Sequence, residues 1–163
     1  MAKREAVIRP LGQPGDLGWV VMAHGELYDR EFGWDSSFEE LVARIVADYT
    51  DQRDPARHAA WVAHINGMRV GCVFCVPADE RTAKLRLLLV DPIARGTGTG
   101  TRLVETCLGF AKAAGYEAIT LWTNDVLTAA RRIYEAHGLE LVAEEPHHSF
   151  GHDLVGQTWY RRL

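Results

Sequence analysis

The chain has 163 residues, which is enough for one domain with a full hydrophobic core and no need for disulfide bonds or a structural metal. Its formal net charge of −4 argues against a general nucleic-acid-binding surface, because such surfaces are normally basic. Three cysteines cannot all pair, which is compatible with a reducing compartment. The N-terminus lacks the apolar core of a signal peptide, and no apolar run approaches the length that spans a bilayer. We therefore expect a single cytoplasmic domain over residues 1–163, with no nucleic-acid or membrane partner.

The first third of the chain predicts one strand and two helices. Residues 4–10 form the predicted strand. Apolar side chains at helical spacing predict a helix over about 16–31. A second helix is expected after the capping pair Ser36–Ser37, and its apolar face reaches Tyr49.

The middle of the chain predicts a β-hairpin. Residues 59–65 and 70–76 are apolar runs, and Asn66–Gly67 between them is typical of a two-residue hairpin turn. Cys72 and Cys75 have the spacing of a metal or redox pair. Residues three apart on a strand point to opposite faces, so we expect both thiols in the core instead.

The second half of the chain predicts the rest of a mixed domain. Gly115 ends one predicted helix and Gly138 caps another. The predicted elements are strand 84–90, helix 101–114, strand 119–122, helix 127–137 and strands 139–142 and 157–160. The fold class is therefore α/β (α+β), with a mixed central sheet of about seven strands flanked by about four helices.

Residues 88–100 are the most informative segment. An apolar strand ends at Asp91–Pro92, and Gly96, Gly98 and Gly100 then alternate with threonines before a helix begins. This arrangement offers backbone N–H groups and the positive end of a helix dipole to a phosphate. It predicts a site for a polyanion, although a glycine-rich helix entry that serves only packing is the alternative.

Spacing excludes two common nucleotide-binding motifs. A P-loop needs Lys-Ser or Lys-Thr after its last glycine, and Thr101–Arg102 stands there. A dinucleotide fingerprint needs a glycine where Thr101 stands and an acidic residue about twenty positions later. Residues 121–123 contain no acid, so neither motif is present.

What remains is Arg-x-x-Gly-x-Gly, with Arg95, Gly98 and Gly100 as its fixed residues. This motif between a strand and a helix resembles the acyl-CoA signature of the GNAT N-acetyltransferases. The order of predicted elements resembles that family over nearly the whole chain, and residues 129–138 resemble its Ala-x-x-x-Tyr-x-x-x-Gly stretch, with Tyr134 as the tyrosine. The resemblance implies the GNAT fold, whose fourth and fifth strands splay apart to form a cleft, and acetyl-CoA (coenzyme A) as cofactor.

The resemblance also implies which residues hold acetyl-CoA. Backbone N–H groups of the glycine loop would bind the pyrophosphate, with Arg95 as a charged partner or a plain surface residue. The main chain of 88–90 would pair with the pantetheine arm as an added strand does. Asn124 matches an asparagine of the family's cleft and suits the cap of the following helix equally well. The predicted cofactor-binding residues are Leu88, Leu89, Val90, Arg95, Gly96, Thr97, Gly98, Thr99, Gly100, Thr101, Asn124, Arg132 and Tyr134.

Tyr134 is predicted to be the general acid. A phenol is a competent proton donor near neutral pH when it lies within hydrogen-bond reach of the leaving sulfur. The alternative is a core aromatic, because residues 126, 130, 133, 134 and 137 share one helical face. A backbone N–H near Leu89 or Val90 is expected to stabilise the oxyanion.

The general base and the acceptor pocket are predicted from position. Strand 84–90 contains no acid, whereas many members of the family place a carboxylate there, so Glu31 in the region between the first two helices is the candidate base. Tyr28, Glu31, Phe32 and Trp34 form the predicted acceptor pocket, with helix packing or a surface position as the alternative.

Three histidines lie in a predicted loop before the last strand. His147, His148 and His152 offer a base near pH 7, or simply belong to an exposed loop. No cysteine or carboxylate cluster accompanies them, so we expect no metal site.

Residues 121–134 and 149–159 look like the acetyltransferase half of bacterial proteins that fuse a MarR-type DNA-binding domain to a GNAT domain. The family resemblance implies an N-acetyltransferase that transfers the acetyl group directly to a small-molecule or peptide amine in a ternary complex. The alternative is a non-catalytic acyl-CoA-binding regulatory module, and a weaker one is a transferase for longer acyl groups. A homodimer through the last strands is compatible with the sequence.

Overall fold

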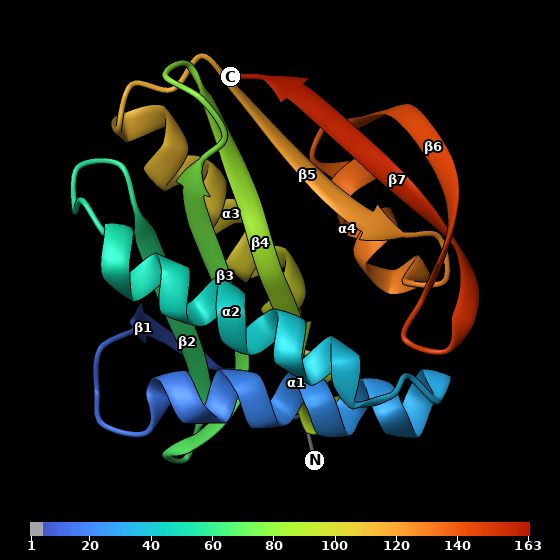
Figure 1. Cartoon of the computed structure of the whole chain (residues 1–163). Coiled ribbons are helices and arrows are strands. Elements are labelled where there is room, and N and C mark those ends of the chain that lie inside the picture. Colours follow the sequence, from blue (N-terminus) through green and yellow to red (C-terminus); the bar gives the residue numbers. More distant parts are fainter. Residues whose placement is uncertain (1–4) are drawn as a thin grey trace.

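A seven-stranded sheet forms the middle layer of the structure, a computed structural model that describes residues 5–163 (Figure 1). The strands are β1 (Val7–Pro10), β2 (Ala59–Ile65), β3 (Met68–Pro77), β4 (Thr82–Val90), β5 (Ala118–Asn124), β6 (Glu140–Ser149) and β7 (His152–Arg162). The helices are α1 (Asp16–Phe32), α2 (Ser36–Gln52), α3 (Thr99–Ala113) and α4 (Thr128–Ala136), with a short 3-10 turn, η1, at Pro92–Ala94. The predicted fold class is confirmed.

The strands lie in the order β1-β2-β3-β4-β5-β7-β6, and within residues 5–163 only β4 and β5 are parallel neighbours. Helices α1 and α2 cover one face, whereas α3 and α4 lie on the other (Figure 1). Each face buries its own apolar cluster, with Val42 and Phe74 in the first and Leu103 and Trp159 in the second. The amphipathic helices are therefore held by burial of their apolar stripes on the sheet.

Two predictions about β3 are confirmed. Asn66 and Gly67 form the tight turn between β2 and β3, with φ values of 52° and 78° as a type I′ turn requires. Cys72 belongs to the apolar cluster under α1 and α2, whereas Cys75 belongs to the cluster on the opposite face. Both thiols are buried and unpaired.

Some predicted boundaries are wrong. The cap of α2 is Asp35, whose carboxylate accepts the N–H of Ser37 at 3.0 Å, so the expected Ser36–Ser37 cap lies inside the helix. Helix α3 begins at Thr99, within the glycine segment, since Gly98 has the left-handed conformation that precedes it. Strand β1 begins at Val7, and Arg4, where the strand was predicted to start, lies outside the described residues.

The predicted loop over 147–152 is also wrong, because these residues belong to the β6–β7 hairpin. Ser149 pairs with His152, and the two-residue turn is Phe150–Gly151, with φ values of 58° and 83°. Strand β6 lies at the edge of the sheet, and most of its side chains are exposed. An edge strand with few buried side chains lacks the alternation of apolar and polar residues from which strands are predicted.

Strand β4 contains a bulge that shapes the cleft. Cys72 of β3 pairs with Leu89, and Phe74 pairs with Arg86, so the single residue Val73 faces two residues of β4. One of the two, Leu87, has a positive φ of 55°. β4 pairs with β5 only over Thr82–Lys84, and the two strands then separate (Figure 1). The predicted splay is confirmed.

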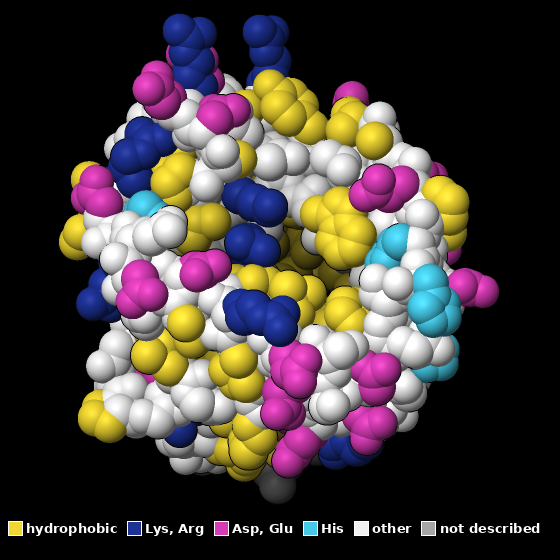
Figure 2. Space-filling model, viewed as in Figure 1, with side chains coloured by type: hydrophobic (Ala, Val, Ile, Leu, Met, Phe, Trp, Pro, Cys, Tyr) yellow, Lys and Arg dark blue, Asp and Glu magenta, His cyan; other side chains and the backbone are white. Residues whose placement is uncertain are grey.

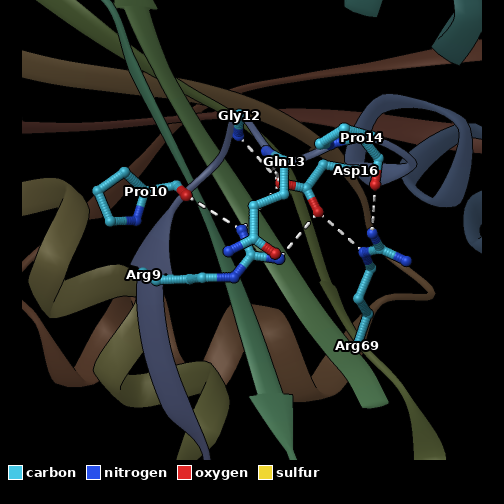
Figure 3. A network of polar contacts seen from close by, with 7 residues as sticks. All are labelled: Arg9, Pro10, Gly12, Gln13, Pro14, Asp16 and Arg69. Carbon is cyan, nitrogen blue, oxygen red and sulfur yellow. Dashed lines mark hydrogen bonds and ion pairs between the residues drawn. The ribbon is translucent and has the colours of Figure 1, made fainter. Parts of the chain in front are cut away.

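Asp16 fastens the start of α1 to the sheet (Figure 3). Its carboxylate is fully buried and accepts two hydrogen bonds from Arg9 of β1, at 2.8 and 2.9 Å, and one from Arg69 of β3, at 2.8 Å. The backbone N–H groups of Gly12 and Gln13 also donate to it. These donors, Arg9 above all, hold the pKa of Asp16 well below its usual range.

We expect Asp16→Asn to lower the free energy of unfolding at pH 7 by about 3 kcal/mol, because two guanidinium groups lose a buried counter-ion. The folded-state pKa of Asp16 is lowered, so its contribution is complete above the unfolded pKa of ~3.9 and is lost as pH falls through the folded value. Urea unfolding of both proteins from pH 7 downward measures this. The gap between the two should be constant above pH ~4.5 and narrow below ~3.9. A constant gap at all pH values would contradict the proposed ion pairing.

Candidate functional site

The separation of β4 from β5 leaves a cavity of about 530 Å³ beside the glycine loop, here named the loop cavity. Its walls come from the end of β4, the loop, the first turn of α3, the last turn of α1 and the segment that leads into α4. Nine predicted cofactor residues line it: Leu88, Leu89, Val90, Arg95, Gly96, Gly98, Thr99, Gly100 and Thr101. The structure therefore brings these residues to one surface.

The loop has the geometry of an anion cradle. Gly96 and Gly98 each have a φ of +77°, a conformation that L side chains rarely adopt. Within residues 5–163, the backbone N–H groups of Gly96 and of Gly98 through Thr101 donate to no protein acceptor. Gly100 serves packing, since a Cβ there would come within 2.9 Å of Ile133. Unpaired donors at a helix start suit a phosphate.

Four predicted cofactor residues do not line the loop cavity. The Thr97 hydroxyl donates to the carbonyl of Ala94 and contacts the Thr99 hydroxyl at 2.6 Å. Arg132 is exposed on α4. Asn124 and Tyr134 line a second cavity instead.

Glu31 and Arg95, predicted as base and pyrophosphate partner, form an ion pair with each other. Both line the loop cavity, where the carboxylate comes from the last turn of α1 and the guanidinium from the loop. Each neutralises the other in the free protein. Glu31 does not line the second cavity.

The second cavity, here named the strand cavity, encloses about 240 Å³ on the β5 side of the splay. It shares Tyr28, Leu88, Leu127 and Ala130 with the loop cavity, so the two spaces meet across these residues. Of the predicted acceptor residues, Tyr28 lines both cavities, Trp34 lines the strand cavity, and Phe32 lines the loop cavity.

Tyr134 projects from α4 toward the splay, where it lines the strand cavity and is 4% exposed. Burial, with a smaller effect of Tyr28, raises the pKa of its phenol. Its hydroxyl has no hydrogen-bond partner among the described residues. The side chain is thus a protonated donor at neutral pH, and it also packs on the core cluster around Trp159 as the alternative prediction required.

Asn124 does not cap α4. The N-cap is Leu127, with no side-chain hydrogen bond, and the Asn124 side chain instead accepts from His147 Nε2 at 2.8 Å. His147 lies beside the ring of Trp122, with 5.3 Å between ring centroids. A Cβ on Gly156 would come within 2.5 Å of Trp122, so the glycine leaves room for this indole on β5. Of these residues, Trp122 and Asn124 line the strand cavity, and His147 and Gly156 pack against them from outside its lining.

His24 is a cavity residue that the sequence did not single out. It is 1% exposed, its Nδ1–H donates to the carbonyl of Val20 at 2.7 Å, and Nε2 has no partner among residues 5–163. Burial lowers its pKa to about 4, so it is neutral at pH 7 with a lone pair on Nε2. Its helical spacing in the sequence was that of an ordinary core residue.

None of the three predicted histidines, His147, His148 and His152, lines either cavity. His148 contacts the exposed Asp153 at 2.8 Å, and His152 contacts the carbonyl of Gly33 at 3.0 Å. Among residues 5–163, no group of three or more histidine, cysteine or carboxylate side chains is placed to hold a metal. In the same range no helix is long and apolar enough to cross a bilayer.

A sequence profile of the acetyltransferase (GNAT) family matches residues 22–139. The chain belongs to this family. It is 27% identical over 151 residues to an uncharacterised N-acetyltransferase of Schizosaccharomyces pombe, covering 92% of this chain and 89% of that protein. It is 35% identical over 91 residues to N-acetylaspartate synthetase of Danio rerio, which covers 55% of this chain but only 32% of that protein. Family and relatives class this GNAT chain as an acyltransferase.

Solved structures share the GNAT fold. A ribosomal-protein-alanine N-acetyltransferase of Brucella melitensis superposes with a TM-score of 0.77 at 17% identity, covering 96% of this chain and 99% of that one. A Salmonella typhimurium protein solved with acetyl-CoA gives 0.76 at 15% identity, covering 98% and 95%. None of these comparisons tests the closer resemblance to MarR–GNAT fusion proteins, which stays a prediction.

We expect Gly98→Ala to weaken acetyl-CoA binding by this GNAT chain by about tenfold or more, because an L side chain disfavours the φ of +77° and the N–H groups of the loop must shift. Gly67→Ala is the matched control. Both glycines have φ near +77° (+77° and +78°) and no heavy atom within 4 Å of an added Cβ, so both variants should lose about 1 kcal/mol of stability.

Thermal unfolding with and without acetyl-CoA measures both effects, with ATP and NADPH as ligand controls. At a hundred times its Kd, acetyl-CoA should stabilise the wild type and Gly67→Ala by roughly 2.7 kcal/mol and Gly98→Ala by clearly less. Equal stabilisation of all three proteins would show that the loop is not the binding site.

Proposed function

We propose that the protein transfers the acetyl group of acetyl-CoA to a primary amine by direct attack in a ternary complex. One observation carries the proposal: the loop cavity and the strand cavity meet across Tyr28, Leu88, Leu127 and Ala130. A donor in the first space and an acceptor in the second would face each other at the end of β4. Such positioning replaces a bimolecular encounter by an oriented one.

The residues of the loop cavity fit acetyl-CoA. The unpaired N–H groups of Gly96 and Gly98 through Thr101 would hold its pyrophosphate, and Arg95 would add a charged contact. The main chain of Leu88–Val90, which β5 leaves unpaired, would hold the pantetheine arm. When bound, the thioester supplies an activated acetyl group, and an N–H near Leu89 or Val90 would stabilise negative charge on its oxygen.

Tyr134 would act as the general acid that protonates the departing sulfur. Burial keeps its phenol protonated at neutral pH, and its hydroxyl has no competing partner among the described residues. It lines the strand cavity next to Ala130 and Leu127, which both cavities share. Asn124 and Arg132 retain the predicted roles in cofactor contact as expectations.

Glu31 would act as the general base once its ion pair with Arg95 breaks. A pyrophosphate would compete with Glu31 for Arg95. Cofactor binding would therefore free the Glu31 carboxylate to accept a proton from the amine. A base on the loop-cavity side would reach the amine through the junction at Tyr28. Within the strand cavity, His24 Nε2 would accept a hydrogen bond from the amine.

The regulatory module is the second candidate, since the unpaired N–H groups of the glycine loop would bind acyl-CoA with or without turnover. It predicts acetyl-CoA binding with no acceptor-dependent release of coenzyme A. Steady release of coenzyme A in the presence of any amine would show that the protein is an enzyme and not a non-catalytic module.

We expect Tyr134→Phe to lower kcat by about 100-fold while the Kd for acetyl-CoA changes little, because only the proton donor is removed. Tyr49→Phe is the control, since Tyr49 is also buried (6% against 4% exposed) but lines neither cavity. Coenzyme A release over an amine panel measures kcat, and thermal stabilisation measures binding. An unchanged kcat would remove Tyr134 from the mechanism.

We expect Glu31→Gln to lower kcat by about 100-fold with acetyl-CoA binding as tight as in the wild type or tighter, because Arg95 loses a competing partner. Glu26→Gln, on an exposed position of the same helix, should change neither quantity. The same two assays apply. Full activity in Glu31→Gln would show that another group, with His24 the next to test, accepts the proton.

A further inference from the structure

Two cations on β4, Lys84 and Arg86, line the strand cavity. Both are half-buried, and neither side chain makes a salt bridge or a hydrogen bond to any residue within 5–163. The lining contains no aspartate or glutamate. In Figure 2 this face of the molecule shows a hollow with an apolar floor and basic side chains along one side.

The bulge in β4 sets this arrangement. Before it, Ala83 and Leu85 face the core cluster under α3, so Lys84 and Arg86 point to the opposite face of the sheet. After it the alternation is reversed, and Leu88 faces the α3 side. The cations therefore lie on the face of α1 and α2, next to the segment where β5 has separated from β4.

Without a bound anion, the positions of Lys84 and Arg86 are electrostatically unfavourable, because both charges are partly buried and lie near each other. Burial, and secondly the charge of Arg86, lower the pKa of Lys84. Burial also lowers the pKa of Arg86, and Asp48 of α2 opposes this only at a distance beyond an ion pair. Two neighbouring cations without a counter-ion are a binding site for an anion, because a ligand carboxylate relieves both effects.

The cavity limits the size and chemistry of the ligand. Its volume of about 240 Å³ suits a molecule of amino-acid size, and Tyr28, Trp34, Phe38 and Trp122 provide apolar walls. The two cations are two residues apart along the strand, roughly 7 Å, and Arg86 lies a similar distance from Leu88 at the junction with the loop cavity. An amine at the junction thus leaves its acidic groups beside Arg86 and Lys84.

We propose that the acceptor is a small amino acid with two carboxylates, whose amine lies at the junction and whose carboxylates bind Arg86 and Lys84. The inference rests on the proposed transferase function and names its acceptor class. The same cations would repel polyamines and other cationic acceptors. The cavity would therefore favour anionic acceptors over cationic ones.

The test is acceptor-dependent coenzyme A release by the whole chain with acetyl-CoA and matched amines. L-aspartate and L-glutamate are compared with L-asparagine, L-glutamine and n-butylamine, and phosphoethanolamine tests phosphate as the anion. The variants are Arg86→Met and Lys84→Met. Arg44→Met is the control, since Arg44 is an exposed residue of α2 outside the cavity lining.

We expect kcat/KM for the two dicarboxylic amino acids to exceed that for their amides by about tenfold or more. Arg86→Met and Lys84→Met should each raise KM for them by about tenfold, with the Kd for acetyl-CoA unchanged, whereas Arg44→Met changes neither. Thermal unfolding shows whether each variant is folded. If Arg86→Met does not fold, the KM of Lys84→Met alone tests the proposal.

Three results would overturn the inference while leaving the transferase intact. These are preference for the amides or n-butylamine, preference for phosphoethanolamine, or an equal loss on every amine in both cavity variants. Absence of acetyl-CoA stabilisation together with absence of coenzyme A release would overturn the transferase proposal, and this inference with it.

Discussion

The functional site depends on the early separation of β4 from β5. Parallel pairing covers only Thr82–Lys84, and the strands then diverge within an otherwise continuous sheet. Elsewhere an unpaired strand edge inside a domain would be a defect, because its N–H and C=O groups are buried without partners. Here both cavities occupy the gap, and groups from both faces of the sheet meet in it. Tyr28 of α1 and Tyr134 of α4, which belong to opposite layers, line the same space for this reason.

The bulge at Leu87 gives the two ends of that gap different chemistry, because cations lie before it and leucines after it. By reversing the alternation of side chains, it places Lys84 and Arg86 before the bulge and Leu87 and Leu89 after it on the same face. One strand thus contributes cations to the strand cavity before the bulge, and after it Leu88 to the junction and Leu89 to the loop cavity. A regular strand would put Leu87 and Leu89 on the α3 side instead. The positive φ of Leu87 is a local cost, held in place by the core packing of its neighbours.

Local signals allowed much of the fold and the loop cavity to be predicted. Asn66–Gly67 and the glycines at 96 and 98 need left-handed conformations, so their structure is contained in a few adjacent residues. The bulge leaves no such signal, because Leu87 stands in a run of leucines that reads as an ordinary strand. The edge strand β6 was predicted too short, because few of its side chains are buried and the sequence shows little apolar alternation there. The pairing of Glu31 with Arg95, 64 positions apart, is a product of tertiary structure alone.

That ion pair holds the predicted base beside the predicted pyrophosphate partner within the loop cavity. Glu31 and Arg95 neutralise each other, so the loop cavity of the free protein carries neither a free base nor an unpaired guanidinium from this pair. A pyrophosphate that attracts Arg95 changes the charge at Glu31 without any movement of the sheet. Glu31 lies three residues from Tyr28 on α1, and the buried Asp16 anchors that helix to β1 and β3, so we expect the carboxylate to remain in the loop cavity when Arg95 turns to the pyrophosphate. The proposed role of Glu31 as the base therefore predicts ordered binding, with acetyl-CoA before the amine, because the carboxylate would become available only after the cofactor has bound.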